Sequence, residues 1–350
     1  MTLLIIRRHL DSIHRFEPEG DGNGNIFVSV IIACKNEEAT LPRILHDLTI
    51  QDYPAGSFEV LVTDDNSEDN TIKTARSFIG SLNLKVLKNS GSGKKSAIRT
   101  AVYEAKGNLI LTTDADCSAN SGWISTIVSF YRLNKPHLII CPVMFEEGNG
   151  FFGRFQELEF LSLQGITAAT AMAGNATMCN GANLAFTHES YLSNEKNLRF
   201  DIPTGDDVFL LHSMKKKGEK ILWLESASAT VVTKAANGLI PFLKQRKRWA
   251  SKSTAYRDRF SIFLGIATLL INLIQAVLLT GAIIEPRLLP LFIAVFIIKS
   301  IPDFLILLNT TKRYEKTTLM RWFLPSQIIY PFYVLIVTLF AISSPSRKGI

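Results

Sequence analysis

The chain has 350 residues and a formal net charge of +7, and 47% of its residues are hydrophobic. This length permits one large domain or two smaller ones, so the domain count depends on how composition changes along the chain. Much of the excess positive charge lies next to an apolar C-terminal quarter, which favours anionic lipid over nucleic acid as a partner. The four cysteines, Cys34, Cys117, Cys141 and Cys179, are widely spaced and indicate neither a disulfide framework nor a zinc site.

The N-terminal segment shows no secretory signal, because the apolar run 2–6 is too short for the core of a signal peptide. Residues 17–25 are rich in Glu, Gly, Asp and Asn, which is typical of a flexible lead into the first strand. We therefore expect an N-terminal lead over 1–25 that precedes the first folded domain.

Short apolar strands alternate with helices over the following 90 or so residues. The expected strands are 27–33, 58–63, 84–88 and 108–113, and the expected helices are 38–49, 70–79 and 94–105. This alternation predicts a mainly parallel, buried sheet. In such sheets ligands bind beyond the carboxyl ends of the strands, so the residues that follow each strand are candidate binding residues.

Acidic and amide side chains follow three of these strands. They are Asn36, Glu37, Asp64, Asp65, Asp114 and Asp116. Two carboxylates one residue apart, as in Asp114-Ala115-Asp116, can hold a hard divalent cation whose other ligands are water and a diphosphate. Such pairs also occur by chance, so the assignment of Asp114 and Asp116 to a metal site depends on their position at the predicted binding edge. For Asp64 and Asp65, hydrogen bonding to a nucleotide base or ribose and a simple turn or helix cap both fit.

A glycine-rich segment, Gly91-Ser92-Gly93-Lys94-Lys95-Ser96, begins the third expected helix. Lys88 stands where a Walker A motif requires glycine, so a nucleoside triphosphatase is not expected. The flexible backbone and Lys94 at a helix start favour a diphosphate, with a solvated helix cap as the alternative.

The second half of the domain is less regular. Its expected elements are an amphipathic helix over 151–166, a strand over 179–186, a helix over 206–217, a strand over 221–232 and a basic helix over 240–249. Two motifs lie here. Gly205-Asp206-Asp207 is explained either by a helix cap or by catalytic acids, and Gln245-Arg246-Lys247-Arg248-Trp249 by a membrane-surface anchor or a functional motif.

Three apolar stretches, 260–284, 288–308 and 322–342, are long enough to span a membrane. The middle one contains Lys299 and Asp303, four residues apart on one helical face, which can pair or pack against a neighbouring helix. Lys and Arg cluster before the first stretch and between the second and third, which predicts that the large domain is cytoplasmic.

In combination the motifs resemble the family-2 glycosyltransferases, the group that includes cellulose, hyaluronan and chitin synthases and many bacterial membrane-bound transferases. The resemblance runs from about Val28 to the end and is carried by VSVIIACKNEE, EVLVTDDNSEDNT, SGKKSAI, the DAD triplet, NGAN, GDD and QRKRW. It implies a Rossmann-like α/β domain of GT-A type over 26–236. An amphipathic interfacial segment with the QxxRW motif over 237–259 and a membrane domain of about three helices over 260–343 would follow.

The resemblance also implies roles for single residues. Asp207 matches the general base, and Asp206 stands where Glu is usual, so which of the two is the base stays open. Asp114 and Asp116 match the DxD motif that engages the nucleotide and a divalent metal, Mg or Mn. The implied nucleotide-sugar residues are Asn36, Glu37, Asp64, Asp65, Lys94, Asp114 and Asn183. Gln245, Arg248 and Trp249 match the motif that closes over the diphosphate and the acceptor end.

We therefore expect an inverting glycosyltransferase of the cytoplasmic (inner) membrane that acts in envelope polysaccharide synthesis. It would move a hexosyl or N-acetylhexosaminyl group, with UDP as the expected nucleotide, to a saccharide or lipid-linked acceptor. A processive polysaccharide synthase subunit is the alternative, although three spans are few for an export channel. A non-catalytic nucleotide-sugar-binding module would have little use for Asp207 or QxxRW. A homo-oligomer and other envelope-biosynthesis partners are left open.

Overall fold

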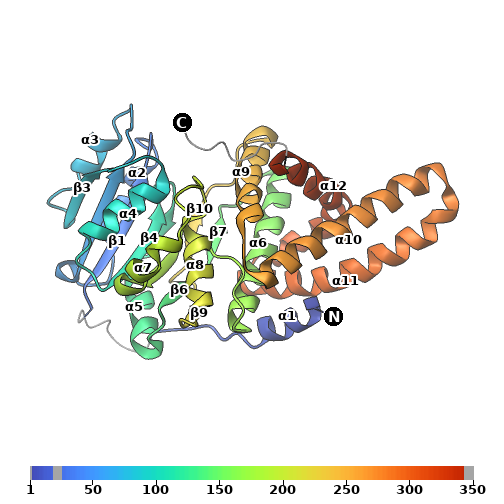
Figure 1. Cartoon of the computed structure of the whole chain (residues 1–350), viewed down its shortest axis with the longest axis horizontal. Helices are drawn as coiled ribbons and strands as arrows, with labels where there is room; N and C mark the ends of the chain where they lie inside the picture. Colours follow the sequence, from blue (N-terminus) through green and yellow to red (C-terminus); the bar gives the residue numbers. More distant parts are fainter. Residues whose placement is uncertain (1, 19–25, 343–350) are drawn as a thin grey trace. The chain divides into compact units, whose positions relative to one another are not determined.

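The computed structural model describes residues 2–18 and 26–342 (Figure 1). The described residues form two compact units. The sheet unit contains 13–146 and 178–234, and the helical unit contains the described parts of 1–12, 147–177 and 235–350. The chain therefore leaves the sheet unit at residue 147 and re-enters it at 178. The domain boundaries predicted from the sequence follow chain order instead, and they stay a prediction.

The sheet unit is built on a seven-stranded sheet in the order β3-β2-β1-β4-β8-β6-β9. The strands are β1 Val28–Cys34, β2 Phe58–Asp64, β3 Leu84–Lys88, β4 Leu109–Asp114, β6 Leu138–Ile140, β8 Leu184–Thr187 and β9 Ile221–Trp223. The first four strands in this order pair in parallel, whereas β8 is antiparallel to both β4 and β6. This arrangement confirms the mainly parallel sheet, and the apolar runs of β1 and β2 are buried as such sheets require.

Six α-helices accompany this sheet in the chain. They are α2 Leu41–Thr49, α3 Thr71–Arg76, α4 Lys94–Glu104, α5 Trp123–Asn134, α7 His188–Asn194 and α8 Asp206–Lys216. Helix α2 shows why the sequence folds this way, because Leu41, Ile44, Leu45 and Leu48 recur at helical spacing and all are buried. It begins three residues later than expected, since the preceding residues form a turn in which the Leu41 N–H donates to the Glu37 carbonyl at 2.9 Å.

A second sheet of three short strands has the order β5-β10-β7, with β5 Ser118–Ala119, β7 Val143–Phe145 and β10 Val231–Thr233. Two strand predictions are corrected here. The strand expected over 179–186 begins only at Leu184, because the Asn183 N–H donates to the Asn180 carbonyl at 3.0 Å and closes a turn. The strand expected over 221–232 is divided into β9 and β10, and the intervening Thr230 N–H bonds the Ala227 carbonyl at 3.1 Å.

The helical unit consists of α1 Thr2–Asp11, α6 Gly150–Met172, α9 Leu239–Ser251, α10 Arg259–Ile284, α11 Leu289–Arg313 and α12 Phe323–Ile342. Three helical segments, Arg259–Ile284, Pro286–Arg313 and Thr317–Ile342, are long and apolar enough to cross a membrane. The predicted C-terminal set of apolar helices is therefore confirmed. The lead expected over 1–25 contains helix α1, and most of its acidic and glycine-rich part lies outside the described residues.

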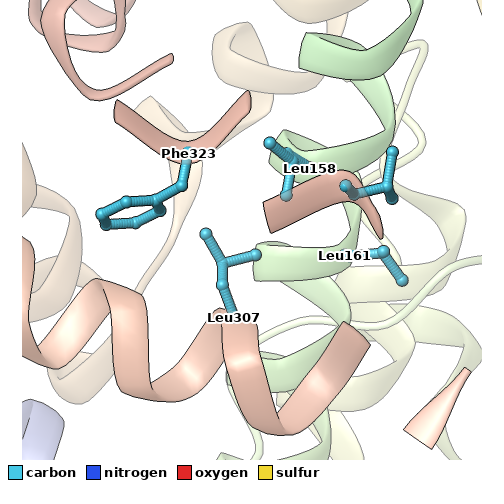
Figure 2. Close-up of a cluster of buried hydrophobic side chains, with 5 residues drawn as sticks. Leu158, Leu161, Leu307 and Phe323 are labelled. Atoms are coloured by element: carbon cyan, nitrogen blue, oxygen red, sulfur yellow. The ribbon is translucent and has the colours of Figure 1, made fainter. Parts of the chain in front are cut away.

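A buried apolar cluster joins α6 to the C-terminal helices (Figure 2). Leu158 and Leu161 of α6 pack with Leu307 of α11, Leu319 of the short helix Thr317–Trp322, and Phe323 of α12. Burying each such side chain contributes about 1.5–3 kcal/mol relative to exposure. Helix α6 is thus held to the apolar helices of its own unit.

The two charged residues of the middle apolar helix form an ion pair in which the lysine is buried and the aspartate is partly exposed. The Lys299 Nζ lies 3.0 Å from an Asp303 carboxylate oxygen and 2.6 Å from the Gln327 side-chain oxygen of α12. Pairing removes most of the cost of a lone charge in an apolar helix. The structure therefore shows both arrangements that the sequence left open, an ion pair and packing against a neighbouring helix.

Candidate active site

The register of the parallel strands brings the predicted acids to one edge of the sheet. Asp64 is opposite Cys34 in the β2–β1 pair, and Asp114 is opposite Ala33 in the β4–β1 pair. The carboxyl ends of β1, β2 and β4 are therefore level. The segments that follow these strands begin at the same edge, as the sequence predicted.

Asn36 and Glu37 tie the segment after β1 to the segment after β2. Asn36 has a positive φ of 58°, its N–H donates to the Ser67 hydroxyl at 2.9 Å, and its side-chain oxygen accepts from the Glu68 N–H at 2.8 Å. The Glu37 N–H donates to the Thr71 hydroxyl at 2.7 Å. These bonds show that both residues stabilise the structure, whether or not they also contact a nucleotide-sugar donor.

The Glu37 carboxylate is also affected by the acids at the end of β4 and just beyond it. Burial raises its pKa, the Thr40 hydroxyl partly offsets this, and the negative charges of Asp116 and Asp114 raise the pKa further. The three carboxylates therefore lie close enough to repel one another. A cation or a protonated site at this edge would relieve that repulsion.

Asp64 and Asp65 are almost fully buried and brace the neighbouring turns. The two Asp64 oxygens accept from the Ser67 N–H at 3.2 and 3.3 Å. The Asp65 carboxylate accepts from the Gly93 N–H at 2.9 and 3.0 Å and from the Asn89 amide at 2.6 Å. A carboxylate has about four acceptor positions, so these bonds leave capacity for a nucleotide. The predicted contact of both residues with a base or ribose stays a prediction.

Lys94 connects the DxD and GDD motifs. It follows Gly93, which has a φ of 83°, and its ammonium forms an ion pair with Asp114. Burial lowers the pKa of Lys94, but the combined attraction of Asp114, Asp206 and Asp207 outweighs burial and raises it. Lys94 is therefore a firmly protonated cation among three acids, placed where a diphosphate could be bound.

Asp116 provides the second carboxylate of the DxD motif. Its Oδ2 accepts from the Thr233 hydroxyl at 3.3 Å, and desolvation together with the Asp114 charge raises its pKa. The positive charge of Lys94 offsets part of this rise.

The donor set around Asp116 defines which metal arrangement fits. Within 2–18 and 26–342, no three His, Cys, Asp or Glu side chains are grouped so that they alone could hold a metal ion. Two carboxylates with diphosphate and water oxygens suit a hard ion such as Mg or Mn, which commonly keeps only one or two protein ligands. Asp114 and Asp116 therefore fit this kind of site and not an all-protein cage.

Asp206 and Asp207 begin α8 directly after Gly205, whose φ of 84° favours glycine. Asp207 accepts the Val208 N–H at 2.7 Å and the Gly181 N–H at 3.3 Å, so its carboxylate is held in a fixed orientation. A Cβ atom on Gly181 would lie 3.4 Å from an Asp206 carboxylate oxygen and 3.9 Å from the Lys94 Nζ. Gly181 therefore lies in ordinary contact range of Asp206 and of the Lys94 ammonium.

The structure does not bring Asn183 to this group. Its side chain is fully buried, its oxygen accepts from the Trp123 indole N–H at 2.9 Å, and its amide donates to the Pro142 and Ala229 carbonyls at 2.7 Å. These bonds tie the start of β8 to two neighbouring segments. The NGAN motif therefore has a clear structural explanation in this fold.

The QxxRW residues lie on α9 of the helical unit. Gln245 accepts from Arg246, Arg248 is exposed, and Trp249 packs against Phe160 with ring centroids 6.1 Å apart. The Arg246 guanidinium lies 4.2 Å from the Trp249 ring centroid, a cation–π distance. The tryptophan is therefore fixed within its own unit.

Sequence reasoning missed two buried cations, Arg246 and Lys95. Arg246 binds the Glu159 carboxylate at 2.5–3.2 Å, and both side chains are nearly inaccessible. Lys95 is buried on the inner face of α4 together with Ile98 and Val102. The signal was present, since each cation is in helical phase with apolar residues that the pattern assigns to the core.

The fold is of the GT-A type. It matches the structure of mannosyltransferase PcManGT from Pyrobaculum calidifontis in complex with GDP-Man and Mn2+, with a TM-score of 0.62 at 19% identity. That match covers 97% of this chain and 93% of the other. Residues 29–193 match the family described as glycosyl transferase family 2. This segment therefore belongs to that family, as the sequence motifs predicted.

Two curated relatives are similar over part of their length. Glycosyltransferase AglE of Haloferax volcanii is 36% identical over 126 residues, which cover 35% of this chain and 41% of the relative. Beta-monoglucosyldiacylglycerol synthase of Trichormus variabilis is 28% identical over 235 residues, which cover 64% of this chain and 48% of the relative. The chain thus spans about half the length of the curated relatives that it matches.

Proposed function

We propose that this chain transfers a sugar from a nucleotide-diphosphate sugar, expected to be a UDP-sugar, to a hydroxyl of a saccharide or lipid-linked acceptor. One observation carries the proposal: Lys94 gathers Asp114, Asp206 and Asp207 at the carboxyl edge of a family-2 sheet. A cation beside the DxD pair can bind a diphosphate, and a fixed carboxylate close by can take a proton.

In the proposed reaction the acceptor oxygen attacks the anomeric carbon while the bond from that carbon to the diphosphate breaks. Lys94 would hold the leaving diphosphate and stabilise the negative charge that grows on it. Asp207 would take the proton from the attacking hydroxyl. A single base without a covalent nucleophile gives inversion at the anomeric carbon. Gln245, Arg248 and Trp249 are proposed to close over the diphosphate and the acceptor end.

Asp114 and Asp116 would hold the divalent ion. Their mutual repulsion and the Mn2+ bound in the mannosyltransferase structure support this assignment. When bound, the ion neutralises diphosphate charge as a Lewis acid. Asn36, Glu37, Asp64 and Asp65 are proposed to line the nucleotide part of the same edge.

We favour Asp207 over Asp206 as the base because two backbone N–H groups orient its carboxylate. Those bonds stabilise the ionised form that a base requires. Asp206 would then help to hold Lys94, whose pKa it raises. This division of roles explains why two adjacent acids begin the helix.

The acceptor is proposed to be held at a membrane. Three apolar helices in the helical unit are long enough to span one, and one relative is named a glucosyldiacylglycerol synthase. We propose the cytoplasmic (inner) membrane as the location, with the sheet unit in the cytoplasm. Few spans favour the addition of one or a few sugars over processive synthesis.

A donor panel tests the proposal. Purified protein in lipid nanodiscs would be given UDP-glucose, UDP-N-acetylglucosamine or GDP-mannose, with Mg, Mn or a chelator, and released nucleotides would be quantified. We expect nucleoside diphosphate from one donor, dependent on metal and on acceptor lipid. Pyrophosphate would indicate nucleotidyl transfer, donor binding without release would indicate a non-catalytic module, and a long polymer would indicate a processive synthase.

A further inference from the structure

The buried ammonium of Lys95 is surrounded by carbonyl oxygens of one loop, 198–204. The side chain is 4% exposed. Its Nζ lies 2.9 Å from each of the carbonyl oxygens of Leu198, Arg199 and Ile202, and 3.2 Å from that of Thr204. An ammonium has three N–H groups, so four acceptors use all of its donor capacity.

This arrangement makes the lysine and the loop dependent on each other. Burying an ammonium costs several kcal/mol unless its N–H groups are bonded, and four converging carbonyl dipoles repel one another unless a cation lies between them. The Phe209 ring of α8, with its centroid 4.9 Å from Nζ, adds a cation–π contact. The loop conformation is also one that the chain does not favour by itself, since Arg199 has a φ of 55°.

The loop leads directly into the candidate catalytic acids. Thr204, whose carbonyl bonds Lys95, is followed at once by Gly205, Asp206 and Asp207. Lys94, the neighbour of Lys95 in the first turn of α4, interacts with the side chains of both acids. The first turn of α4 therefore makes two kinds of contact. Lys95 binds the backbone of the loop that precedes the acids, and Lys94 interacts with the side chains of the acids themselves.

We propose that Lys95 is a positioning residue that holds the loop 198–204 and thereby fixes the Asp206 and Asp207 carboxylates next to Lys94. The inference rests on the proposed function, and Lys95 acts through the loop backbone without touching the donor. Loss of the ammonium would let the loop relax and displace the base. A displacement of about 1 Å in a reacting group can lower the rate by about 100-fold.

The test compares Lys95→Met with the matched control Lys216→Met, an exposed lysine at the end of α8. Amide hydrogen exchange would be followed over 198–207, and kcat and donor KM would be measured in nanodiscs. We expect Lys95→Met to speed exchange in this segment and to lower kcat by about 100-fold, while donor KM changes less than about threefold. Lys216→Met should leave all three quantities at wild-type values.

A second variant keeps the proposal falsifiable if Lys95→Met does not fold. Lys95→Arg retains the charge, but its planar guanidinium does not match four carbonyls that converge on one point, so the same changes are expected in smaller degree. Wild-type exchange over 198–207 in whichever variant folds, or faster exchange with an unchanged kcat, would overturn the proposal. If the wild-type protein releases no nucleoside diphosphate, the proposed function fails, whereas the exchange data still decide whether Lys95 orders the loop.

Discussion

The two units differ in how their charged side chains are arranged: one contains a buried pair of opposite charges, and the other a group of carboxylates at a sheet edge. In the helical unit the buried Arg246 and Glu159 satisfy each other, and the Tyr333 hydroxyl donates to the same carboxylate at 2.9 Å. In the sheet unit, Asp114 and Asp116 repel each other and Glu37, and both Glu37 and Asp116 have raised pKa values.

The difference separates structural charge from charge that is prepared for a ligand. A buried ion pair with a good hydrogen-bond geometry needs nothing further, and breaking it leaves an uncompensated charge. A group of like charges at a sheet edge is costly without a partner, and such perturbed groups are concentrated at functional sites. We therefore expect substitutions in the helical pair to change stability, and substitutions at the edge to change chemistry.

The largest effect is expected from Asp207→Asn, which keeps the size of the side chain but removes its basicity. General-base catalysis contributes about 100- to 10,000-fold, so kcat should fall by about 1,000-fold while donor KM changes little. The measurement is release of nucleoside diphosphate under saturating donor and acceptor.

Asp206→Asn is the matched control for that substitution. It weakens the electrostatic support of Lys94 and should raise donor KM more than it lowers kcat. The roles of the two acids would be reversed if Asp206→Asn abolished turnover and Asp207→Asn did not. Normal unfolding temperatures of both variants would show that the sheet unit is intact.

The next largest effect is expected in the helical unit. Glu159→Gln should lower the free energy of unfolding by about 3 kcal/mol, because it leaves the buried Arg246 guanidinium without its counter-charge. Thermal unfolding in nanodiscs would measure this loss. The exposed pair Glu285 and Arg287, 3.8 Å apart, offers the control. Glu285→Gln should cost less than about 1 kcal/mol, and an equal loss in both variants would contradict our distinction between the two kinds of charge.

The sequence was sufficient to predict the parallel strands, the three apolar helices and the family. Each of these depends on local pattern: β-branched runs bounded by turns, uncharged stretches of membrane length, and motifs in a fixed order. The acids of DxD could be proposed because the ends of parallel strands share one edge, whereas those of GDD were assigned by the family resemblance.

Other features depend on contacts between distant segments, which periodicity does not encode. The transfer of α6 to the helical unit follows from the packing of Leu158 and Leu161 against residues some 150 positions later. Asn183 looked like a ligand-binding residue in its motif, but its amide is used to join separate segments. The carbonyl cage of Lys95 likewise requires a loop about 100 residues away.

The smallest expected effect concerns Asp116 and depends on pH. Because the folded protein raises the pKa of Asp116, the metal-free fold binds this proton more tightly than the unfolded chain does. The stabilisation that this more tightly bound proton gives the folded protein is thus present at acid pH, and it is lost as pH rises through the folded pKa of Asp116. Asp116 is exposed, so water screens this effect. Asp116→Asn should therefore stabilise the metal-free protein only slightly at pH 7.5, by less than about 1 kcal/mol, and not at acid pH.

Asp201 gives this test a control of opposite sign. Its pKa is lowered by Arg199, so Asp201→Asn should destabilise the protein near neutral pH, and the difference should vanish as pH falls through the folded pKa. Added Mn2+ with nucleoside diphosphate should raise the unfolding temperature of the wild type and of Asp201→Asn but not of Asp116→Asn, because a ligand stabilises only a fold that binds it. If Mn2+ stabilised Asp116→Asn as much as the wild type, Asp116 would not be a metal ligand. The repulsion between the carboxylates at this edge would then not be explained by metal binding.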